Sequence, residues 1–324
     1  MERLRIGIVG YGNLGKGVEL AVSQNQDMEL VAVLSRRSLG KTSSGVPVVS
    51  IEERAQYRDA IDVVILCGGS ATDLVTQGPQ FAALFHTVDS YDTHAKIPEY
   101  FAAMDSTAKA AGKVSTISVG WDPGLFSLNR VLAGSVLPRG TDYTFWGKGV
   151  SQGHSDALRR ITGVRDAKQY TIPKQEVIDA VRSGQRPPVP ANEAHIRDCY
   201  VVAEAGADLG RIESTIKTMP YYFVGYETVV TFISEEEFQA KHSGIPHGGF
   251  VFRTGETSPG VNHVLEFAVK LDSNPEFTAS VLAAYARATF RLAQDGVTGA
   301  CTIFDIPIGL LSPKPAEALR KESL

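Results

Sequence analysis

The sequence predicts an α/β protein in which a doubly wound parallel sheet comes first and an α+β unit follows. Two observations carry this prediction. Apolar runs alternate with helical stretches along the first third of the chain, and the first run leads directly into a glycine-rich turn. After about residue 126 the segments alternate or are β-branched and have long connections, which is typical of a mixed or antiparallel sheet.

The first strand ends in that glycine-rich turn. An apolar run from Leu4 to Val9 leads into Gly10-Tyr11-Gly12-Asn13-Leu14-Gly15, and a helical stretch extends through Val22. In this spacing the first glycine permits a tight turn, the second lets the backbone approach a pyrophosphate, and the third lets the helix pack on the strand. With a second apolar run from Leu30 to Leu34, the pattern predicts a Rossmann-type unit that binds a dinucleotide; a glycine-rich turn without a ligand is the alternative.

The end of the second strand indicates which dinucleotide. NAD sites usually have an acidic residue there, about 20 residues beyond the glycines, which holds the ribose hydroxyls. This chain has Ser35-Arg36-Arg37 instead. No carboxylate follows the strand to repel a 2′-phosphate, and two guanidiniums and a hydroxyl can bind one, at about 1.5–3 kcal/mol for each charge-assisted hydrogen bond. The segment therefore favours NADP over NAD, with a solvated basic turn as the alternative.

Three more strands are predicted in the first third, and each ends in a polar or glycine-rich loop. The strands span residues 61–67, 86–89 and 114–119, and a helix over 98–111 that stops at Gly112 precedes the last. Their loops are Cys67–Ser70, Asp89–Asp92 and Gly120–Gly124. Ligands of open α/β sheets lie beyond the carboxyl ends of the strands, so we expect these loops to converge with the glycine turn on one site.

These patterns predict two domains. We expect a dinucleotide-binding domain over 1–122 and a substrate-binding and dimerisation domain over 123–274, with strands near 143–146, 199–203 and 227–233. A long helix over 275–294 and a polar, helical tail over 309–324 are expected to pack back on the first domain.

Composition limits the class of protein. The chain has 324 residues, a net charge of −4 and an ordinary hydrophobic content of 43%, so nothing indicates nucleic-acid binding. Three well-separated cysteines, Cys67, Cys199 and Cys301, match neither a disulfide framework nor a zinc site, and we expect buried thiols and no metal. With no signal peptide and no apolar stretch of about 18 residues or more, we expect a cytoplasmic protein that does not bind membranes.

Several acidic and aromatic residues lie at the predicted ligand edge. Asp92 and Asp122 each follow a strand, and Trp121 precedes Asp122. An aspartate in such a place is often a turn or helix cap, and a tryptophan in a glycine loop is often a packing lid. Because Asp92 and Asp122 converge on one edge of the predicted sheet, a functional role is favoured for them more than for an aspartate in an ordinary turn. The spacing alone does not show where residues of the second domain lie relative to this edge.

Nine segments of the chain together form a pattern that is found in one known family. They are GYGNLG, SRR, SATD, VDSYD, GWDPG, TFWGKGVSQGHSDALRRI, TMPYYFVGYE, PHGG and LDSNPEFTAS. With these segments the chain resembles the meso-2,6-diaminopimelate dehydrogenases, which are NADP-dependent enzymes of bacterial lysine biosynthesis. The resemblance extends from the first strand nearly to the end of the chain, and FWGKGVSQGHSDALRRI is its most specific stretch. One departure is Gly68, where we expect a methionine.

The resemblance implies reversible oxidative deamination at the D-configured centre of meso-diaminopimelate. The products are L-2-amino-6-oxopimelate (tetrahydrodipicolinate after cyclisation), ammonia and NADPH. It also implies a homodimer formed through the middle domain. A D-amino-acid dehydrogenase of this kind needs both signs of charge in one cleft, because its substrate has two ammonium groups and two carboxylates.

The resemblance also implies which residues form the site. Asp92 and Asp122 are the expected catalytic residues, which hold the reacting ammonium and can accept a proton, although no single general base is indicated. The expected substrate contacts are Asp92, Asp122, Trp121, Trp146, Gln152, Gly153, Thr171, Arg197, His247 and Asn274. The expected cofactor contacts are Gly10, Tyr11, Gly12, Asn13, Leu14, Gly15, Ser35, Arg36, Arg37, Cys67, Gly68, Gly69, Ser70, Pro123, Gly124, Leu125 and Phe126.

Three other functions compete with this one. A sugar dehydrogenase or dihydrodipicolinate-type reductase of the same architecture is the first, but sugar dehydrogenases of this shape usually show a Glu-Lys-Pro segment that this chain lacks. A non-catalytic NADP sensor is the second and predicts binding without turnover. A scaffold or nucleic-acid protein is the third, and the acidic charge balance argues against nucleic acid.

Overall fold

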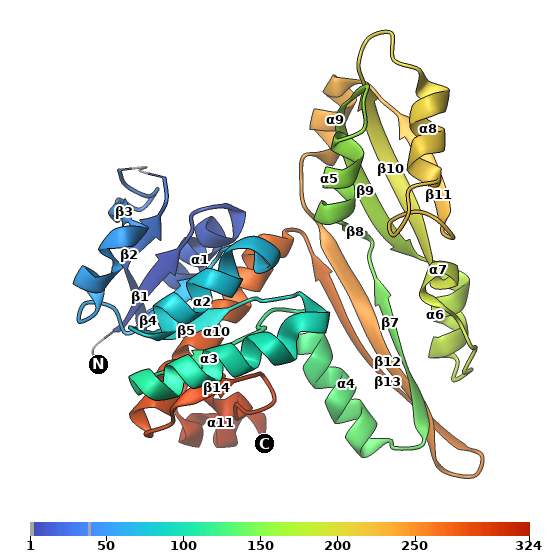
Figure 1. The fold of residues 1–324 in the computed structure, drawn as a ribbon. Coiled ribbons are helices and arrows are strands. Elements are labelled where there is room, and N and C mark those ends of the chain that lie inside the picture. Colours follow the sequence, from blue (N-terminus) through green and yellow to red (C-terminus); the bar gives the residue numbers. More distant parts are fainter. Residues whose placement is uncertain (1–2, 38–39) are drawn as a thin grey trace. The chain divides into compact units, whose positions relative to one another are not determined.

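A computed structural model describes residues 3–37 and 40–324 of the chain (Figure 1). The chain divides into two compact units. Unit 1 comprises residues 1–128 and 275–324, and unit 2 comprises residues 129–274. The division between the units falls after Leu128, inside helix α4 (Leu125–Val136).

Unit 1 contains a seven-stranded parallel sheet with the order β14-β6-β5-β4-β1-β2-β3. The chain leaves β1 in one direction to form β2 and β3, then returns to the centre and builds outward through β4, β5 and β6. This is the doubly wound order, so the predicted fold class is confirmed. The strands are β1 (Leu4–Val9), β2 (Met28–Ser35), β3 (Val48–Ser50), β4 (Val63–Leu66), β5 (His86–Asp89), β6 (Val114–Thr116) and β14 (Gly299–Cys301).

Two apolar cores cover the two faces of this sheet. Val63 and Ile65 of β4 belong to one core, and Val64 and Leu66 belong to the other. Since successive side chains of a strand point to opposite faces, burial on both sides produces the continuous apolar runs seen in the sequence. Helices α1 (Asn13–Gln24) and α10 (Asn274–Gln294) pack on the first face, and α2 (Val75–Ala82) and α3 (Ile97–Ala111) on the second.

The end of the chain completes unit 1. Strand β14 pairs with β6, and α10 contributes apolar side chains such as Leu282 and Ala286 to the same core as β1. The tail is less helical than expected, because α11 spans only Ala316–Ser323 and a short 3₁₀ turn, η4, spans Ile308–Leu311. No helix among residues 3–37 and 40–324 is long and apolar enough to cross a membrane.

Unit 2 contains two sheets. Strands β7 (Gly140–Trp146), β12 (His247–Ser258) and β13 (Val261–Leu271) form an antiparallel sheet. The second sheet has the order β11-β10-β9-β8 and is mixed, because β11 (Glu227–Phe232) runs parallel to β10 (His195–Ala203), whereas β9 (Val164–Pro173) and β8 (Gly149–Val150) pair antiparallel. Besides part of α4, unit 2 contains the helices α5 (Gln152–Arg159), α6 (Gln175–Arg182), α7 (Ala191–Ala194), α8 (Leu209–Lys217) and α9 (Glu235–His242).

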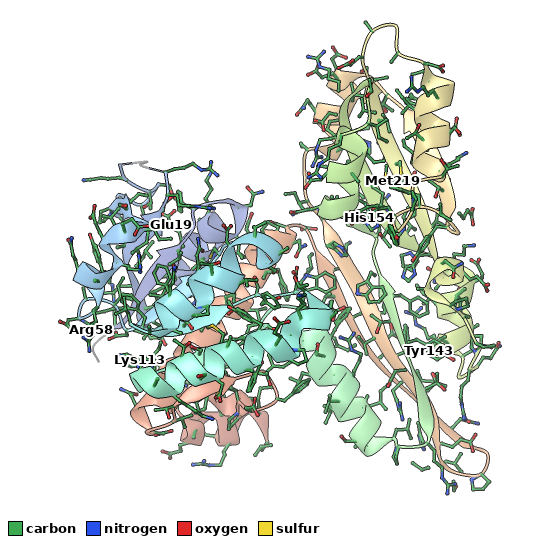
Figure 2. The ribbon with its side chains drawn as sticks, in the orientation of Figure 1. Glu19, Arg58, Lys113, Tyr143, His154 and Met219 are labelled. Atoms are coloured by element: carbon green, nitrogen blue, oxygen red, sulfur yellow. The ribbon has the colours of Figure 1, made fainter. Side chains whose placement is uncertain are left out.

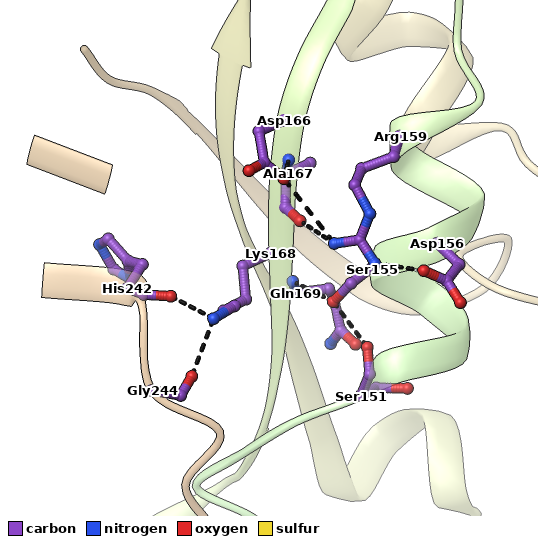
Figure 3. Close-up of polar contacts among 10 residues, drawn as sticks. All are labelled: Ser151, Ser155, Asp156, Arg159, Asp166, Ala167, Lys168, Gln169, His242 and Gly244. Carbon is purple, nitrogen blue, oxygen red and sulfur yellow. Dashed lines mark hydrogen bonds and ion pairs between the residues drawn. The ribbon is translucent and has the colours of Figure 1, made fainter. Parts of the chain in front are cut away.

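Polar side chains attach two helices of unit 2, α5 and α9, to β9 (Figure 3). Ser155 of α5 donates to the Ser151 carbonyl at 2.6 Å and accepts from the Gln169 amide at 3.0 Å. On the other side of β9, the Lys168 ammonium donates to the carbonyls of His242 and Gly244, and the former is the last residue of α9. A cation at a helix C-terminus satisfies carbonyls that have no partner within the helix.

Candidate functional site

The glycine turn has the geometry that the motif predicts. Gly10 adopts a φ of +88°, and a Cβ on Gly15 would lie 2.1 Å from the Gly10 carbonyl oxygen, so both positions require glycine. A Cβ on Gly12 would meet open space instead. The N-cap residue of α1 is Gly12, which has no side chain that could accept from the first N–H groups of the helix. The turn thus presents backbone donors toward an open space suited to a phosphate.

A pocket lies beside this turn, between the ends of β1, β2 and β4. Nine of its lining residues are expected cofactor contacts: Gly10, Tyr11, Gly12, Ser35, Arg36, Arg37, Cys67, Gly68 and Gly69. Sequence reasoning missed the other four, Leu34, Ile51, Asp73 and Gln77. The remaining expected contacts, Asn13, Leu14, Gly15, Ser70, Pro123, Gly124, Leu125 and Phe126, do not line this pocket.

One side chain of the pocket corrects an expectation. We expected no carboxylate near the 2′-phosphate position, but Asp73 lines the pocket and its Oδ1 forms an ion pair with Arg36 Nη2 at 2.8 Å. Asp73 follows β4, in the short π-helical turn Ser70–Leu74, so the fold brings it to β2 from a distant part of the sequence. Arg37 has no ion pair among the described residues, and its amide donates to Ser35 Oγ at 3.0 Å.

Gly68 also has a steric explanation. A Cβ at this position would lie 2.7 Å from the Asp73 Cβ and 3.0 Å from Gln77 Oε1, so a side chain here would require the following turn to shift. Cys67 is only partly buried and lines the pocket, whereas Cys199 and Cys301 are buried thiols as expected. The described residues contain no cluster of histidine, cysteine or carboxylate side chains that could hold a metal ion.

Asp92 and Asp122 lie in loops that other residues of unit 1 hold in place. The Asp92 amide donates to Ser70 Oγ at 3.1 Å, which joins the loops after β5 and β4. The buried Trp121 packs edge-on against Phe126, with ring centroids 5.2 Å apart, so its ring acts as a packing element within the unit. Both aspartates therefore lie at the carboxyl edge of the parallel sheet.

The buried carboxylate of Asp89 organises the same edge. Its Oδ1 accepts from the amides of Tyr91 (2.9 Å) and Ser118 (3.2 Å), and its Oδ2 accepts from the Tyr100 hydroxyl (2.8 Å). Burial raises the pKa of Asp89 to about 6, against these hydrogen bonds, which favour the charged form. Asp89 thus links the ends of β5 and β6, which precede Asp92 and Asp122.

Unit 2 brings several expected substrate contacts to one end of its sheets. Thr171 pairs with Arg197 on one side and with Gly149 on the other. His247 packs against Gly149, since a Cβ there would lie 2.5 Å from the imidazole, and the Asn274 amide donates to the carbonyl of Ile245 nearby. Thr171, Arg197, His247 and Asn274 therefore come from one region although they are far apart in the sequence.

Arg197 is the most unusual residue of that region. It is 9% exposed, its Nη1 donates to Thr171 Oγ1 at 2.6 Å, and its guanidinium lies 4.1 Å from the Tyr226 ring centroid. Its buried Nε has no hydrogen-bond partner, and within the described ranges no carboxylate pairs with it. Burial lowers the pKa of the guanidinium. A buried cation without a counter-charge is costly, so the position suits an anionic ligand.

Sequence reasoning did not single out the neighbours of Arg197. Burial, and then the charge of Arg197, lower the pKa of His154 to about 4, so this imidazole (labelled in Figure 2) is neutral at pH 7. The His154 ring lies edge-on to Tyr222, with centroids 5.2 Å apart. These residues fall within two of the specific segments quoted above, but no spacing rule connects them to Arg197.

The remaining expected contacts lie on other parts of unit 2. Trp146 ends β7, and its amide donates to His195 Nε2 at 3.0 Å, while its side chain is 37% exposed. Gln152 and Gly153 begin α5 after the N-cap Ser151, and both are exposed. The exposed Gln152 and Gly153 thus lie in the first turn of α5.

Comparison with known proteins decides the family. Residues 120–273 match the family described as the diaminopimelic acid dehydrogenase C-terminal domain. Over its whole length the chain is 60% identical to a protein of Lysinibacillus sphaericus named meso-diaminopimelate D-dehydrogenase, all of which it covers. The chain belongs to the meso-diaminopimelate D-dehydrogenases. It is therefore an oxidoreductase, an amino-acid dehydrogenase.

Two solved structures are similar to nearly the whole chain. A mutant meso-dapdh from Clostridium tetani, solved with DAP, is 54% identical with a TM-score of 0.94, and the match covers 99% of this chain and all of the other. An engineered D-amino acid dehydrogenase bound to NADP⁺ is 46% identical with a TM-score of 0.86, over 99% of this chain and all of the other. The fold of the meso-diaminopimelate D-dehydrogenases is thus that of this chain.

Proposed function

We propose that this meso-diaminopimelate D-dehydrogenase catalyses the NADP-dependent, reversible oxidative deamination of the D-centre of meso-2,6-diaminopimelate. Substrate, NADP⁺ and water give L-2-amino-6-oxopimelate (which cyclises to tetrahydrodipicolinate), ammonium and NADPH with a proton. Family membership supports the reaction class, the NADP⁺ in the engineered relative supports the cofactor, and the DAP in the Clostridium tetani relative supports the substrate.

The observation that carries the substrate assignment is the buried guanidinium of Arg197. A carboxylate at the distal, non-reacting centre would supply its missing counter-charge, and two charge-assisted hydrogen bonds can form in the bidentate arrangement. Thr171 already holds one nitrogen of the group at 2.6 Å, and the Tyr226 ring covers it, so little rearrangement is needed on binding. A rigid, pre-oriented cation discriminates in favour of substrates that have this second carboxylate.

A relative supports the same residues. The Clostridium tetani protein was changed at six positions whose original types are Gln, Thr, Arg, Pro, His and Asn. The same types occur here with the same spacing, at Gln152, Thr171, Arg197, Pro246, His247 and Asn274. Five of these six are expected substrate contacts.

The residues of unit 1 fit NADP. The glycine turn leaves open space where a Cβ on Gly12 would stand, and Ser35, Arg36 and Arg37 line the adjoining pocket. When bound, the cofactor accepts a hydride from the α-carbon of the substrate. We assign the pyrophosphate to the turn and the 2′-phosphate to the end of β2, where Arg37 has no ion pair among the described residues and Arg36 can exchange Asp73 for the phosphate.

The carboxylates of Asp92 and Asp122 are proposed to act on the substrate. They bind and orient the reacting ammonium, and a proton must leave this nitrogen before its lone pair can assist loss of the hydride. A carboxylate or a water molecule can accept that proton, and we name no single general base. Positioning of the α-hydrogen supplies much of the catalysis. The exposed Trp146, with Gln152 and Gly153, is proposed to line the reacting centre.

Absorbance of NADPH tests this proposal directly. Purified protein is mixed with NADP and meso-diaminopimelate, with LL-diaminopimelate and NAD as parallel controls. Turnover with the meso isomer and NADP alone supports the substrate, the reacting centre and the cofactor together. Binding of NADP without turnover would replace the proposal by a sensor function, and turnover with the LL isomer would contradict D-centre chemistry.

The resemblance supports three further parts of the proposal. We place the enzyme in lysine biosynthesis, in the cytoplasm, and as a homodimer formed through unit 2. Light scattering of the purified protein tests the dimer, and growth of a deletion strain with and without lysine tests the pathway.

A further inference from the structure

One buried carboxylate of unit 1 takes no part in the chemistry described so far. Glu19 lies on α1, one helical turn beyond the glycine turn, and is only 4% exposed (labelled in Figure 2). No ion pair of Glu19 occurs within residues 3–37 and 40–324. The hydrogen bonds that Glu19 accepts from the described residues all come from neutral groups. This is unusual, because a buried carboxylate normally has a cationic partner.

The donors come from two segments on either side of Glu19 in the sequence. The Tyr11 hydroxyl of the glycine turn donates to Oε2, and so does Ser43 Oγ at 3.0 Å. The Ser44 amide donates to Oε1 at 2.9 Å, together with the Ser44 hydroxyl. These bonds outweigh burial, which opposes ionisation, and lower the pKa of Glu19 to about 2. Glu19 is therefore ionised at every physiological pH.

The second segment is a closed turn that follows the two arginines. Lys41 and Pro47 form an antiparallel bridge, and the Gly45 amide donates to the Thr42 carbonyl at 3.1 Å. Thr42 Oγ1 accepts from the Val46 amide at 3.1 Å. Residues 41–47 therefore form a turn closed by its own hydrogen bonds, and the Glu19 side chain accepts the bonds that attach this turn to α1.

Both segments adjoin the cofactor pocket at one end. Tyr11 lines the pocket at the glycine turn, and Arg36 and Arg37 line it at the end of β2, a few residues before the 41–47 turn. The Glu19 carboxylate thus accepts hydrogen bonds both from Tyr11, which lines the pocket, and from the 41–47 turn, which follows Arg36 and Arg37 in the sequence. We propose that Glu19 is a positioning residue for the adenosine 2′-phosphate end of this pocket, acting through Tyr11 and the 41–47 turn. This inference rests on the proposed NADP dependence.

Glu19→Gln is the first test. It keeps the size of the side chain but replaces one acceptor oxygen by an NH₂ group, which cannot accept the hydrogen bonds that Tyr11, Ser43 and Ser44 donate. We expect the affinity for NADP, and for the probe adenosine 2′,5′-bisphosphate, to fall at least about tenfold in calorimetry with the whole protein, which is about 1.4 kcal/mol. The kcat at saturating NADP and the KM for meso-diaminopimelate should change less than about twofold. Glu29→Gln, an exposed glutamate of β2, is the matched control and should change none of these values.

A second variant covers the case in which Glu19→Gln fails to fold. Ser43→Ala removes one neutral donor from an exposed residue and leaves the charge in place. It should weaken binding of the bisphosphate severalfold, and the loss should be smaller when Glu19 is already glutamine, as expected of partners in one network.

The outcomes separate this inference from the function on which it rests. If the unmodified protein binds the bisphosphate and both variants bind it equally well, Glu19 is merely structural and the inference is wrong. A tenfold rise in the KM for diaminopimelate with unchanged cofactor affinity would overturn it as well. If the unmodified protein does not bind the bisphosphate or NADP, the proposed cofactor itself is wrong.

Discussion

Replacement of Arg197 by methionine would remove the guanidinium while keeping a long apolar side chain. In the free protein this substitution gives up the 2.6 Å hydrogen bond to Thr171 and the contact with Tyr226. It also removes a buried cation that has no carboxylate partner in the described part of the chain. Because the desolvation cost of the charge disappears with it, we expect the melting temperature of Arg197→Met to stay within a few degrees of the unmodified value.

The effect on the substrate should be far larger. Two charge-assisted hydrogen bonds to the distal carboxylate are worth about 1.5–3 kcal/mol each, or about 3–6 kcal/mol together. At about 1.4 kcal/mol per factor of ten, kcat/KM for meso-diaminopimelate should fall about a hundredfold to ten-thousandfold, mostly through KM.

The assay compares two substrates and two variants at saturating NADP. D-Lysine has the same reacting centre and distal amino group but lacks the distal carboxylate, so its kcat/KM should be low with the unmodified enzyme and should not fall further in Arg197→Met. Arg165→Met, which changes an exposed arginine of β9 that pairs with Glu235, is the control. An unchanged KM for diaminopimelate together with a large loss of stability would refute the reasoning and make Arg197 a structural cation.

Three further predictions concern unit 1. Arg37→Ala should weaken NADP binding about tenfold or more and should weaken NAD binding less. Its effect on NADP should also exceed that of Arg36→Ala, because Arg36 already pairs with Asp73. Equal losses of NADP and NAD affinity in a titration would exclude a contact between Arg37 and the 2′-phosphate. The pKa of Asp89 in the folded protein, about 6, lies above its ordinary value of 3.8, so between these pH values the folded protein binds more protons than the unfolded one. The contribution of Asp89 to the free energy of unfolding therefore decreases as the pH rises from about 4 to about 6. Asp89→Asn should flatten this pH dependence in thermal melts, and an unaltered dependence would assign it to another group. Asp122→Asn should lower kcat by about a hundredfold or more if the carboxylate orients the reacting ammonium, whereas a kcat within a few-fold of the original would make it only a loop cap.

The local patterns predicted most of unit 1 because burial on both faces of a parallel sheet leaves a clear signal. The apolar runs before the glycine turn and at 61–67 correspond to β1 and β4, and Gly112 ends α3 with a φ of +64° as its position suggested. Strand β6 is shorter than the strand predicted over 114–119, because Ser118 already has a positive φ and its amide turns toward Asp89.

The features that the sequence did not predict depend on contacts between segments that are far apart along the chain. Asp73 reaches Arg36 because β4 and β2 both flank β1, a relation that spacing along the chain does not encode. The parallel direction of β11 follows from the intervening helix α8, which carries the chain back before the strand begins. The neighbours of Arg197 come from α5 and from the segment before β11, so only the folded sheet brings His154 and Tyr226 to it.

The composition of unit 1 from two separate stretches of chain has a consequence for synthesis on the ribosome. The edge strand β14 and the long helix α10 emerge after all of unit 2 has been made, so the first 128 residues expose the core face that α10 later covers. Residues 129–274 form a continuous segment that can reach its final structure first. In a nascent chain arrested before residue 275, unit 2 should therefore be able to fold, whereas unit 1 would lack α10 and β14. Its exposed apolar core face would then depend on chaperones.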